Sequence, residues 1–480
     1  MRAGEKSSKS RDVAARLLPV IGLGALFGTL LISSSTVNLL IDHSNPSAFI
    51  KTFSVSETYA AAVISAVCAI FIFLRKQIPS RLLQVSGAVL YIVGSLCFLY
   101  FSFYEIQNEL IVIAGATICG AGCVALCLVW GRVFSRFHLK QALINVSVAC
   151  LIAIFIHGIE MWCPREVDFS LFIALTVLAV AIPGFIGIPS SLSSEAPTKG
   201  YKLKTTETLK SLAVVMVEPA LGLFFFAFAV ALLRGDLVHS YNLYLLAFGL
   251  SSLILLGYSL IKRHTFTIRS LYQTFVSLLA IILLAAMSLS PVMNFQFRLI
   301  TFLVFLLSLF SMILAVSIFC AIANAAEFST DLIFSLAIFV FSLSSGIGQH
   351  ISRVFLVNKV DIALVITTTL YAFLMIAFSY NRWRQANSWN NEHLEPKEEI
   401  HSLDEKCSTI ADRYRLTSRE YEIFSYLAKG HSGTYIAETL LISPNTARTH
   451  IHNIYRKLDI SSREDILRLV HMQDSDKSQT

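Results

Sequence analysis

LTSREYEIFSYLAKGHSGTYIAETLLISPNTARTHIHNIYRKLDISSREDILRLV, residues 416–470, has the pattern of a small domain built from four helices. Thr417 followed three residues later by Glu420 predicts a capping box at the start of the first helix. Gly430 marks the end of that helix, and Ser432 can cap a second one. The segment therefore predicts an all-α domain.

The third predicted helix follows Ser443 and has two distinct faces. Its apolar residues recur at intervals of three and four, which places them on one side: Ala447, Ile451, Ile454, Tyr455 and Leu458. Polar residues occupy the opposite side: Arg448, Thr449, His452 and Arg456. One interpretation is that these side chains are simply exposed to solvent on an outer face. The other is that they point together into a groove as wide as a helix, such as the major groove of DNA. We expect Arg448 to contact guanine and His450 to be partly buried.

Residues 414–472 resemble the LuxR-type (NarL-like) four-helix DNA-binding domain, with its turn-containing motif at about 432–458. The matching residues are Leu416, Thr417, Arg419, Glu420, Glu422, Gly430, Ile436, Ala437, Leu440, Ile442, Ser443, Thr446, His450, Ile451, Ile454, Tyr455, Lys457, Leu458 and Arg463. The resemblance implies that the first half of the third helix enters the major groove, so that Arg448, Thr449 and His452 face the bases. It also implies phosphate or supporting contacts from Thr446, Asn453 and Lys457, while Arg456 shares the side that faces the groove.

A fourth helix, from Ser462 to about Met472, carries four apolar residues: Ile466, Leu467, Leu469 and Val470. The LuxR resemblance implies that this helix forms the contact of a homodimer on DNA. The alternative is that these residues only close the domain's own core. RNA polymerase is left open as a further partner.

One part of the segment departs from the family. Gly433, Thr434 and Tyr435 stand where Asn, Lys and Glu are common, which removes a usual basic phosphate contact. Residues 415–472 contain eight Lys or Arg against six Asp or Glu. Counterion release alone would therefore bind this domain to DNA weakly, and a dimer on a two-fold site would compensate.

The rest of the chain has the composition of a membrane protein. It is 55% hydrophobic and only 14% charged over 480 residues, which excludes an ordinary soluble globule. A spanning helix needs about 20 apolar residues. Twelve such segments are predicted: 17–40, 57–74, 82–103, 109–133, 141–161, 168–188, 211–233, 241–261, 267–289, 297–324, 332–352 and 361–380. The predicted fold is an all-α polytopic membrane domain followed by the small DNA-binding domain.

Basic residues between the spans predict the orientation. They concentrate in alternate loops and in the tail 1–16, which places both termini in the cytoplasm of a bacterial cell with the spans in its inner membrane. We expect no cleaved signal peptide, because the first apolar segment is too long. A polar linker, 381–413, with a short helix around Ser402 to Tyr414, would join the bilayer to the DNA-binding domain, and residues 473–480 form a polar tail.

The twelve predicted spans divide six and six around a central cytoplasmic loop, 189–209. This arrangement resembles the major facilitator superfamily, whose two halves hold a substrate near the midplane. The loop between the second and third spans keeps only basic character and Gly87 of the family's motif. The resemblance therefore implies a fold, and we carry over no transport residues.

Polar residues inside the spans are the candidates for contact with a small-molecule ligand, because burying them in a bilayer is costly. Glu218 precedes Pro219 in the seventh span and could meet a cation, a proton or an arginine. A structural ion pair is the alternative. His157 and Glu160 lie one turn apart near the outer end of the fifth span. Gln349 and His350 lie near the outer end of the eleventh span, and either pair could be interfacial instead.

Three cysteines spaced by four, Cys119, Cys123 and Cys127, suggest a soft metal ion. Close packing through Gly115, Gly120 and Gly122 explains the same stretch more simply. We therefore predict no metal and no cofactor. The sequence also has no phosphate-binding loop and no kinase motif, so we expect no enzymatic activity.

Together the two resemblances imply a one-component regulator that senses a ligand through its membrane domain and binds DNA at its C-terminus. Two alternatives remain. One is a secondary transporter of the major facilitator type with a regulatory DNA-binding tail, and the other is a membrane anchor that carries a constitutive DNA-binding domain.

Overall fold

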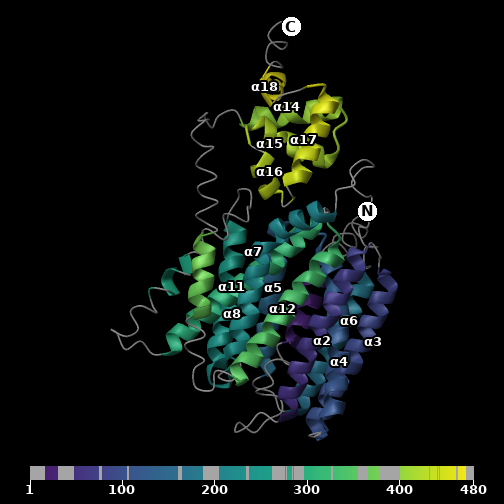
Figure 1. Cartoon of the computed structure of the whole chain (residues 1–480), viewed down its shortest axis with the longest axis vertical. Helices are drawn as coiled ribbons and strands as arrows, with labels where there is room; N and C mark the ends of the chain where they lie inside the picture. Colours follow the sequence, from purple (N-terminus) through teal and green to yellow (C-terminus); the bar gives the residue numbers. More distant parts are fainter. Residues whose placement is uncertain are drawn as a thin grey trace, which may run out of the picture. The chain divides into compact units, whose positions relative to one another are not determined.

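The computed structural model describes most of the predicted helices (Figure 1). The described residues are 17–30, 48–74, 78–104, 108–160, 165–186, 205–233, 237–261, 276, 278–279, 281–283, 285, 297–325, 328–354, 366–377, 400–431, 433–440, 442, 444–460 and 463–471. The described part of the chain is almost entirely helical and contains no strand. The chain divides into two compact units. One contains most of the apolar helices, and the other contains the C-terminal helices together with the first residues of the helix that begins at Thr205.

The membrane unit contains long apolar helices. Their bounds are α2 (Ala48–Phe73), α3 (Ser80–Tyr104), α4 (Glu109–Phe134), α5 (Leu139–Glu160), α6 (Arg165–Ile186), α7 (Thr205–Leu232), α8 (Leu237–Ile261), α11 (Phe297–Asn324) and α12 (Thr330–Val354). Nine helices in the described residues are long and apolar enough to span a membrane, and Leu17–Leu30 and Ile366–Ala377 are shorter apolar helices. The predicted polytopic all-α fold is confirmed. The predicted span 267–289 lies mostly outside the described residues.

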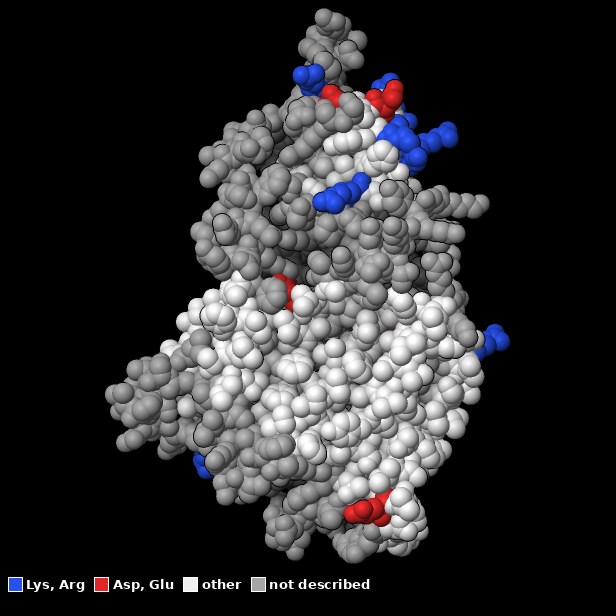
Figure 2. All heavy atoms as spheres, in the orientation of Figure 1, with Lys and Arg blue, Asp and Glu red and all other residues white. Residues whose placement is uncertain are grey.

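Charged side chains are scarce among the described residues on the face of this unit that Figure 2 shows. Large apolar side chains are exposed instead, for example Val63, Leu110 and Phe185. Such a surface is stable only against an apolar solvent, because apolar area in water is unfavourable. The unit is therefore built to face lipid.

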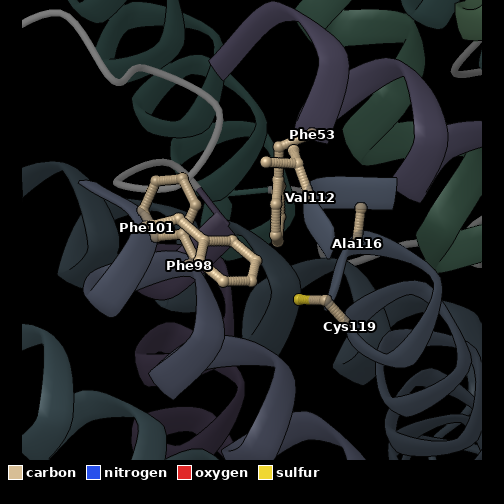
Figure 3. Packing of buried hydrophobic residues seen from close by; sticks show 6 residues of the cluster. All are labelled: Phe53, Phe98, Phe101, Val112, Ala116 and Cys119. Carbon is tan, nitrogen blue, oxygen red and sulfur yellow. The ribbon is translucent and has the colours of Figure 1, made fainter. Parts of the chain in front are cut away.

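Small residues bring α3 and α4 close together. A Cβ atom on Gly122 would lie 2.3 Å from the backbone nitrogen of Tyr91, and one on Gly94 would lie 2.4 Å from the Cα atom of Cys119. Aromatic rings fill the space beside this contact, where Phe53, Phe98 and Phe101 cluster near Cys119 (Figure 3). This stretch of α4 thus packs closely against its neighbours, as the glycines there suggested.

A buried ion pair connects the first half of the membrane unit with the second. Arg132 in α4 donates from Nε to Asp331 Oδ1 at 2.7 Å and from Nη2 to Asp331 Oδ2 at 2.5 Å, across 199 positions of sequence. The guanidinium also donates to Ser80 Oγ at 3.0 Å and to the carbonyl oxygen of Ile78 at 2.9 Å. Asp331 lies in the first turn of α12 and Ser80 begins α3, so one arginine in α4 connects these three helices.

The C-terminal unit has five helices in its described part: α14 (Ile400–Arg413), α15 (Ser418–Ala428), α16 (Gly433–Thr439), α17 (Pro444–Leu458) and α18 (Arg463–His471). The first of these, α14, is the helix predicted in the linker. Its residues Cys407, Ile410 and Ala411 are buried, and it packs on α15 and α18. The C-terminal part of the predicted linker 381–413 is therefore a structural part of the C-terminal unit.

Candidate DNA-binding surface

The first helix of the predicted domain, α15, is held at both ends by local hydrogen bonds. The backbone nitrogen of Glu420 donates to Thr417 Oγ1 at 3.3 Å, and that of Thr417 donates to Glu420 Oε2 at 2.8 Å. The predicted capping box is confirmed. At the other end Gly430 has a φ of 82°, and the next amide, of His431, donates to the carbonyl of Tyr426 at 3.0 Å. This geometry favours glycine because a Cβ atom is strained at positive φ.

The third helix, α17, has the two faces that the sequence predicts. Ala447, Ile454 and Leu458 are buried in the core of the unit. On the other side Arg448, His452 and Arg456 are exposed, one helical turn apart over about 12 Å. The remaining predicted contact residues on this helix are half-buried: Thr446, Thr449, Asn453 and Lys457. Asn453 Oδ1 accepts a hydrogen bond from Arg456 Nη2 at 3.4 Å.

Lys457 has contacts inside the domain that fit the supporting one of its two predicted roles. Its Nζ donates to Glu420 Oε2 at 2.5 Å and to the carbonyl oxygen of Arg415 at 3.2 Å. The pair fastens the end of α17 to the start of α15. Burial acts to raise the pKa of Glu420, but hydrogen bonds from Lys457 and Thr417 outweigh it, and the net pKa is lowered. Lys457 therefore positions the exposed face of the helix.

Two further contacts organise the inner side of α17. His450 is half-buried, as predicted, and burial together with the nearby Arg419 lowers its pKa. Arg419 donates to Glu422 Oε2 at 2.7 Å and to the carbonyl oxygen of Leu440 at 3.0 Å. Because Leu440 follows α16, Arg419 links α15 to the helix that precedes the turn.

The predicted dimerisation residues in α18 separate into two groups. Ile466 and Val470 are buried in the unit's own core, so their side chains are not accessible to a second copy. Leu469 is half-buried, and the side chain of Leu467 lies outside the described residues. Ile466 and Val470 therefore pack in the domain's own core, which was the alternative to a dimer contact. A dimer contact through α18 would have to use the other side of the helix.

The predicted ligand residues lie on two membrane helices. Glu218 in α7 and His157 in α5 are both buried. Pro219 lies inside α7, next to Glu218, as expected from the sequence. Glu160 ends α5, and its side chain lies outside the described residues.

Sequence reasoning overlooked Glu57. The predicted span began at that residue, whereas α2 begins at Ala48, so the carboxylate lies within the helix. Cys119 donates from Sγ to Glu57 Oε1 at 3.5 Å. Polar residues before Glu57, such as Lys51 and Ser54, lower the local hydropathy, so a search for apolar segments placed the start of the helix too late.

The C-terminal helices match a known family. Residues 414–470 match the family described as "Bacterial regulatory proteins, luxR family". These residues form a LuxR-type DNA-binding domain. A similar curated protein is the response regulator protein VraR of Staphylococcus saprophyticus subsp. saprophyticus, with 35% identity over 77 residues, 16% of this chain. The chain spans 37% of the length of that relative, and the match is confined to one region of each protein.

The membrane unit is similar in fold to transporters of the major facilitator superfamily. The outward conformation of the transporter FucP gives a TM-score of 0.51 at 12% identity, covering 76% of this chain and 99% of that one. A bacterial homologue of the iron transporter ferroportin, outward-facing with soaked iron, gives 0.54 at 9% identity, covering 78% and 98%. Identities this low show the fold alone. The major facilitator resemblance is confirmed at that level.

Proposed function

We propose that this chain is a one-component transcription regulator of the bacterial inner membrane. It senses a small-molecule ligand through its membrane unit and binds double-stranded DNA through its LuxR-type domain. The observation that carries the proposal is the exposed face of α17, where Arg448, His452 and Arg456 project from a LuxR-type domain in the same chain as a polytopic membrane unit. DNA binding by such a helix places its N-terminal residues against base edges.

Ligand sensing requires two states of the membrane unit that bind the ligand with different affinity. A change between two such states would alter polar contacts between the two halves of the unit, of which Arg132–Asp331 is one. Glu218, His157 and Glu160 are the proposed ligand residues. Both termini would lie in the cytoplasm, where the DNA is, and RNA polymerase would be a further partner.

The proposal is tested by crosslinking the full-length protein to the genome and sequencing the recovered DNA. We expect discrete sites that are lost in Arg448→Ala, because one base contact is worth about 1–3 kcal/mol of binding free energy. Arg413→Ala is the matched control, since Arg413 is also exposed but lies on α14. Recovery of the same sites from the Arg448→Ala strain would remove this residue from the base-contacting set.

Dimerisation on DNA is the second part of the proposal. Leu469, and Leu467 beside it, are the remaining apolar candidates on α18. Replacing both with Asp should weaken binding to a paired site more than binding to a half-site, which a gel-shift titration measures. Equal losses on both DNAs would show that these residues serve only the core.

A secondary transporter with a regulatory DNA-binding tail is the alternative function. The similarity of the membrane unit to transporters of the major facilitator superfamily favours it. It predicts proton-coupled uptake by vesicles that contain the protein, and loss of that uptake in Glu218→Gln. Uptake with these properties would replace the sensor proposal.

A further inference from the structure

A buried amide side chain connects α12 to α2, near the end of α12 that is opposite Asp331. Gln349 is only 3% exposed, and its Nε2 atom donates to Ser345 Oγ at 3.2 Å and to Thr58 Oγ1 in α2 at 3.5 Å. Thr58 in turn donates to the carbonyl oxygen of Ser54 at 2.7 Å. Because that bond uses the hydroxyl hydrogen of Thr58, Thr58 must accept from the amide. This assigns the nitrogen of Gln349, and not its oxygen, to the side that faces α2.

The oxygen of the same amide is unsatisfied. Gln349 Oε1 is buried and has no hydrogen-bond donor among the residues that the structure describes. Ser345 lies one helical turn away and accepts from Gln349 Nε2, and its own hydroxyl hydrogen has no acceptor within the described part of the chain. A buried carbonyl oxygen without a donor has lost the hydrogen bonds that water would give it, which destabilises this state. Gln349 and Ser345 therefore present one unused acceptor and one unused donor side by side.

This pair of groups lies where the two halves of the membrane unit meet. Helix α2 belongs to the first half and α12 to the second, and the two helices pack against each other. Tyr59 Oη donates to the carbonyl oxygen of Gly346 at 3.1 Å, and a Cβ atom on Gly346 would lie 2.9 Å from the Tyr59 ring. The interface is thus closed around Gln349, so a molecule reaches Oε1 only when α2 and α12 move apart. Such a molecule binds two states of the unit with different affinity, which is what sensing requires.

We propose that Gln349 and Ser345 form a binding site for an uncharged ligand group that both donates and accepts a hydrogen bond. A hydroxyl group or a primary carboxamide would donate to Gln349 Oε1 and accept from Ser345 Oγ. Both side chains are neutral, so the site has no charge with which to select an ion. This inference rests on the proposed sensing function and names the chemical class of the ligand. It adds two uncharged residues to the ionisable ones proposed above.

Thermal melting of the full-length protein in detergent micelles tests the site with three probes. Myo-inositol supplies hydroxyl groups, nicotinamide supplies a primary carboxamide, and tetramethylammonium is a cation without a hydrogen-bond donor. At least one neutral probe should raise the melting temperature, by about 1–4 °C at roughly tenfold excess over its dissociation constant, and tetramethylammonium should not. The neutral probe that does so shows which of the two groups the site accepts. No shift with either neutral probe would overturn the proposal.

Variants on α12 separate this site from binding elsewhere. Gln349→Leu should weaken binding of the effective probe about tenfold or more, because the donor of the probe is left without an acceptor. Ser345→Ala removes the smaller donor group and should weaken binding about threefold to tenfold. Ser344→Ala is the matched control, since the Ser344 hydroxyl donates within α12 to the carbonyl oxygens of Val340 and Phe341. Melting curves over a range of probe concentrations give the affinities, and wild-type affinity in Gln349→Leu or in Ser345→Ala would overturn the proposal.

The binding site and the proposed function fail in different ways, because thermal melting does not depend on DNA. If a neutral probe stabilises wild type through Gln349 but crosslinking recovers no genomic sites, the regulator proposal is overturned and the binding site stands. If genomic sites are recovered and are lost in Arg448→Ala, while neither neutral probe shifts the melting temperature, only the binding site is overturned.

Discussion

Two ion pairs of equal length stabilise the two units of this protein in different ways. Arg132 and Asp331 lie 2.5 Å apart in the membrane unit, with side chains only 1% and 6% exposed. Lys457 and Glu420 also lie 2.5 Å apart in the DNA-binding unit, but the lysine is 31% exposed and the glutamate 7%. Distance alone therefore does not measure how much an ion pair stabilises a structure.

The two ion pairs differ in what can contact the remaining charge after one residue of the pair is removed. If Lys457 is removed, water can reach part of the site, and the Thr417 hydrogen bonds still hold Glu420. If Arg132 is removed, the Asp331 carboxylate loses two hydrogen bonds in a place that water hardly reaches. A buried charge without a partner is far more costly than a partly exposed one.

The largest predicted effect is therefore on the buried pair. Arg132→Met should destabilise the protein by about 3–5 kcal/mol, because it leaves the Asp331 charge buried and uncompensated. Thermal unfolding of detergent-solubilised protein measures this loss. The double variant Arg132→Met/Asp331→Leu removes both charges and should recover much of the stability. A single variant as stable as wild type would show that water reaches Asp331.

Breaking the half-exposed pair should cost less. Glu420→Gln keeps a side chain that suits the capping box but loses the charge that Lys457 pairs with, and should cost about 1–2 kcal/mol after solvent screening. The pKa of Glu420 is lowered, so its contribution to stability is present above its ordinary pKa. That contribution is lost as the pH falls through the lowered value. Chemical denaturation of wild type and Glu420→Gln should differ at neutral pH and converge in acid, whereas a constant difference would contradict this assignment.

The smallest effect concerns salt. If Lys457 only supports α17, Lys457→Met should leave the slope of DNA affinity against salt unchanged, although affinity itself falls with the displaced helix. A direct phosphate contact would instead reduce the slope by about 0.9. Lys457→Arg, which keeps the charge and the bond to Glu420, is the control. Gel-shift titrations at several salt concentrations provide the slopes.

The features that the sequence could predict depend on residues close together in the chain, whereas the missed features depend on residues far apart. The capping box at Thr417 and the two faces of α17 follow from spacing within a few residues, and the structure confirms them. No local pattern predicts the pair of Arg132 and Asp331, because the two residues lie 199 positions apart. The burial of Ile466 and Val470 was left open, since their side chains meet other helices and no local pattern reports that contact.

The start of α2 shows a second reason for failure. Polar residues before Glu57 lowered the local hydropathy, although α2 begins at Ala48. Hydropathy reports contact with lipid, whereas the helix continues through residues that contact protein. A carboxylate inside the span was therefore taken as its boundary.

The most direct test of the central claim is to recover DNA with the membrane. After crosslinking of intact cells, inner membranes are isolated and the DNA attached to them is sequenced. The account predicts that discrete genomic fragments are enriched with membranes from wild-type cells, and that the enrichment disappears in Arg448→Ala at equal protein abundance. Equal recovery from both strains, or fragments found only in the soluble fraction, would contradict it.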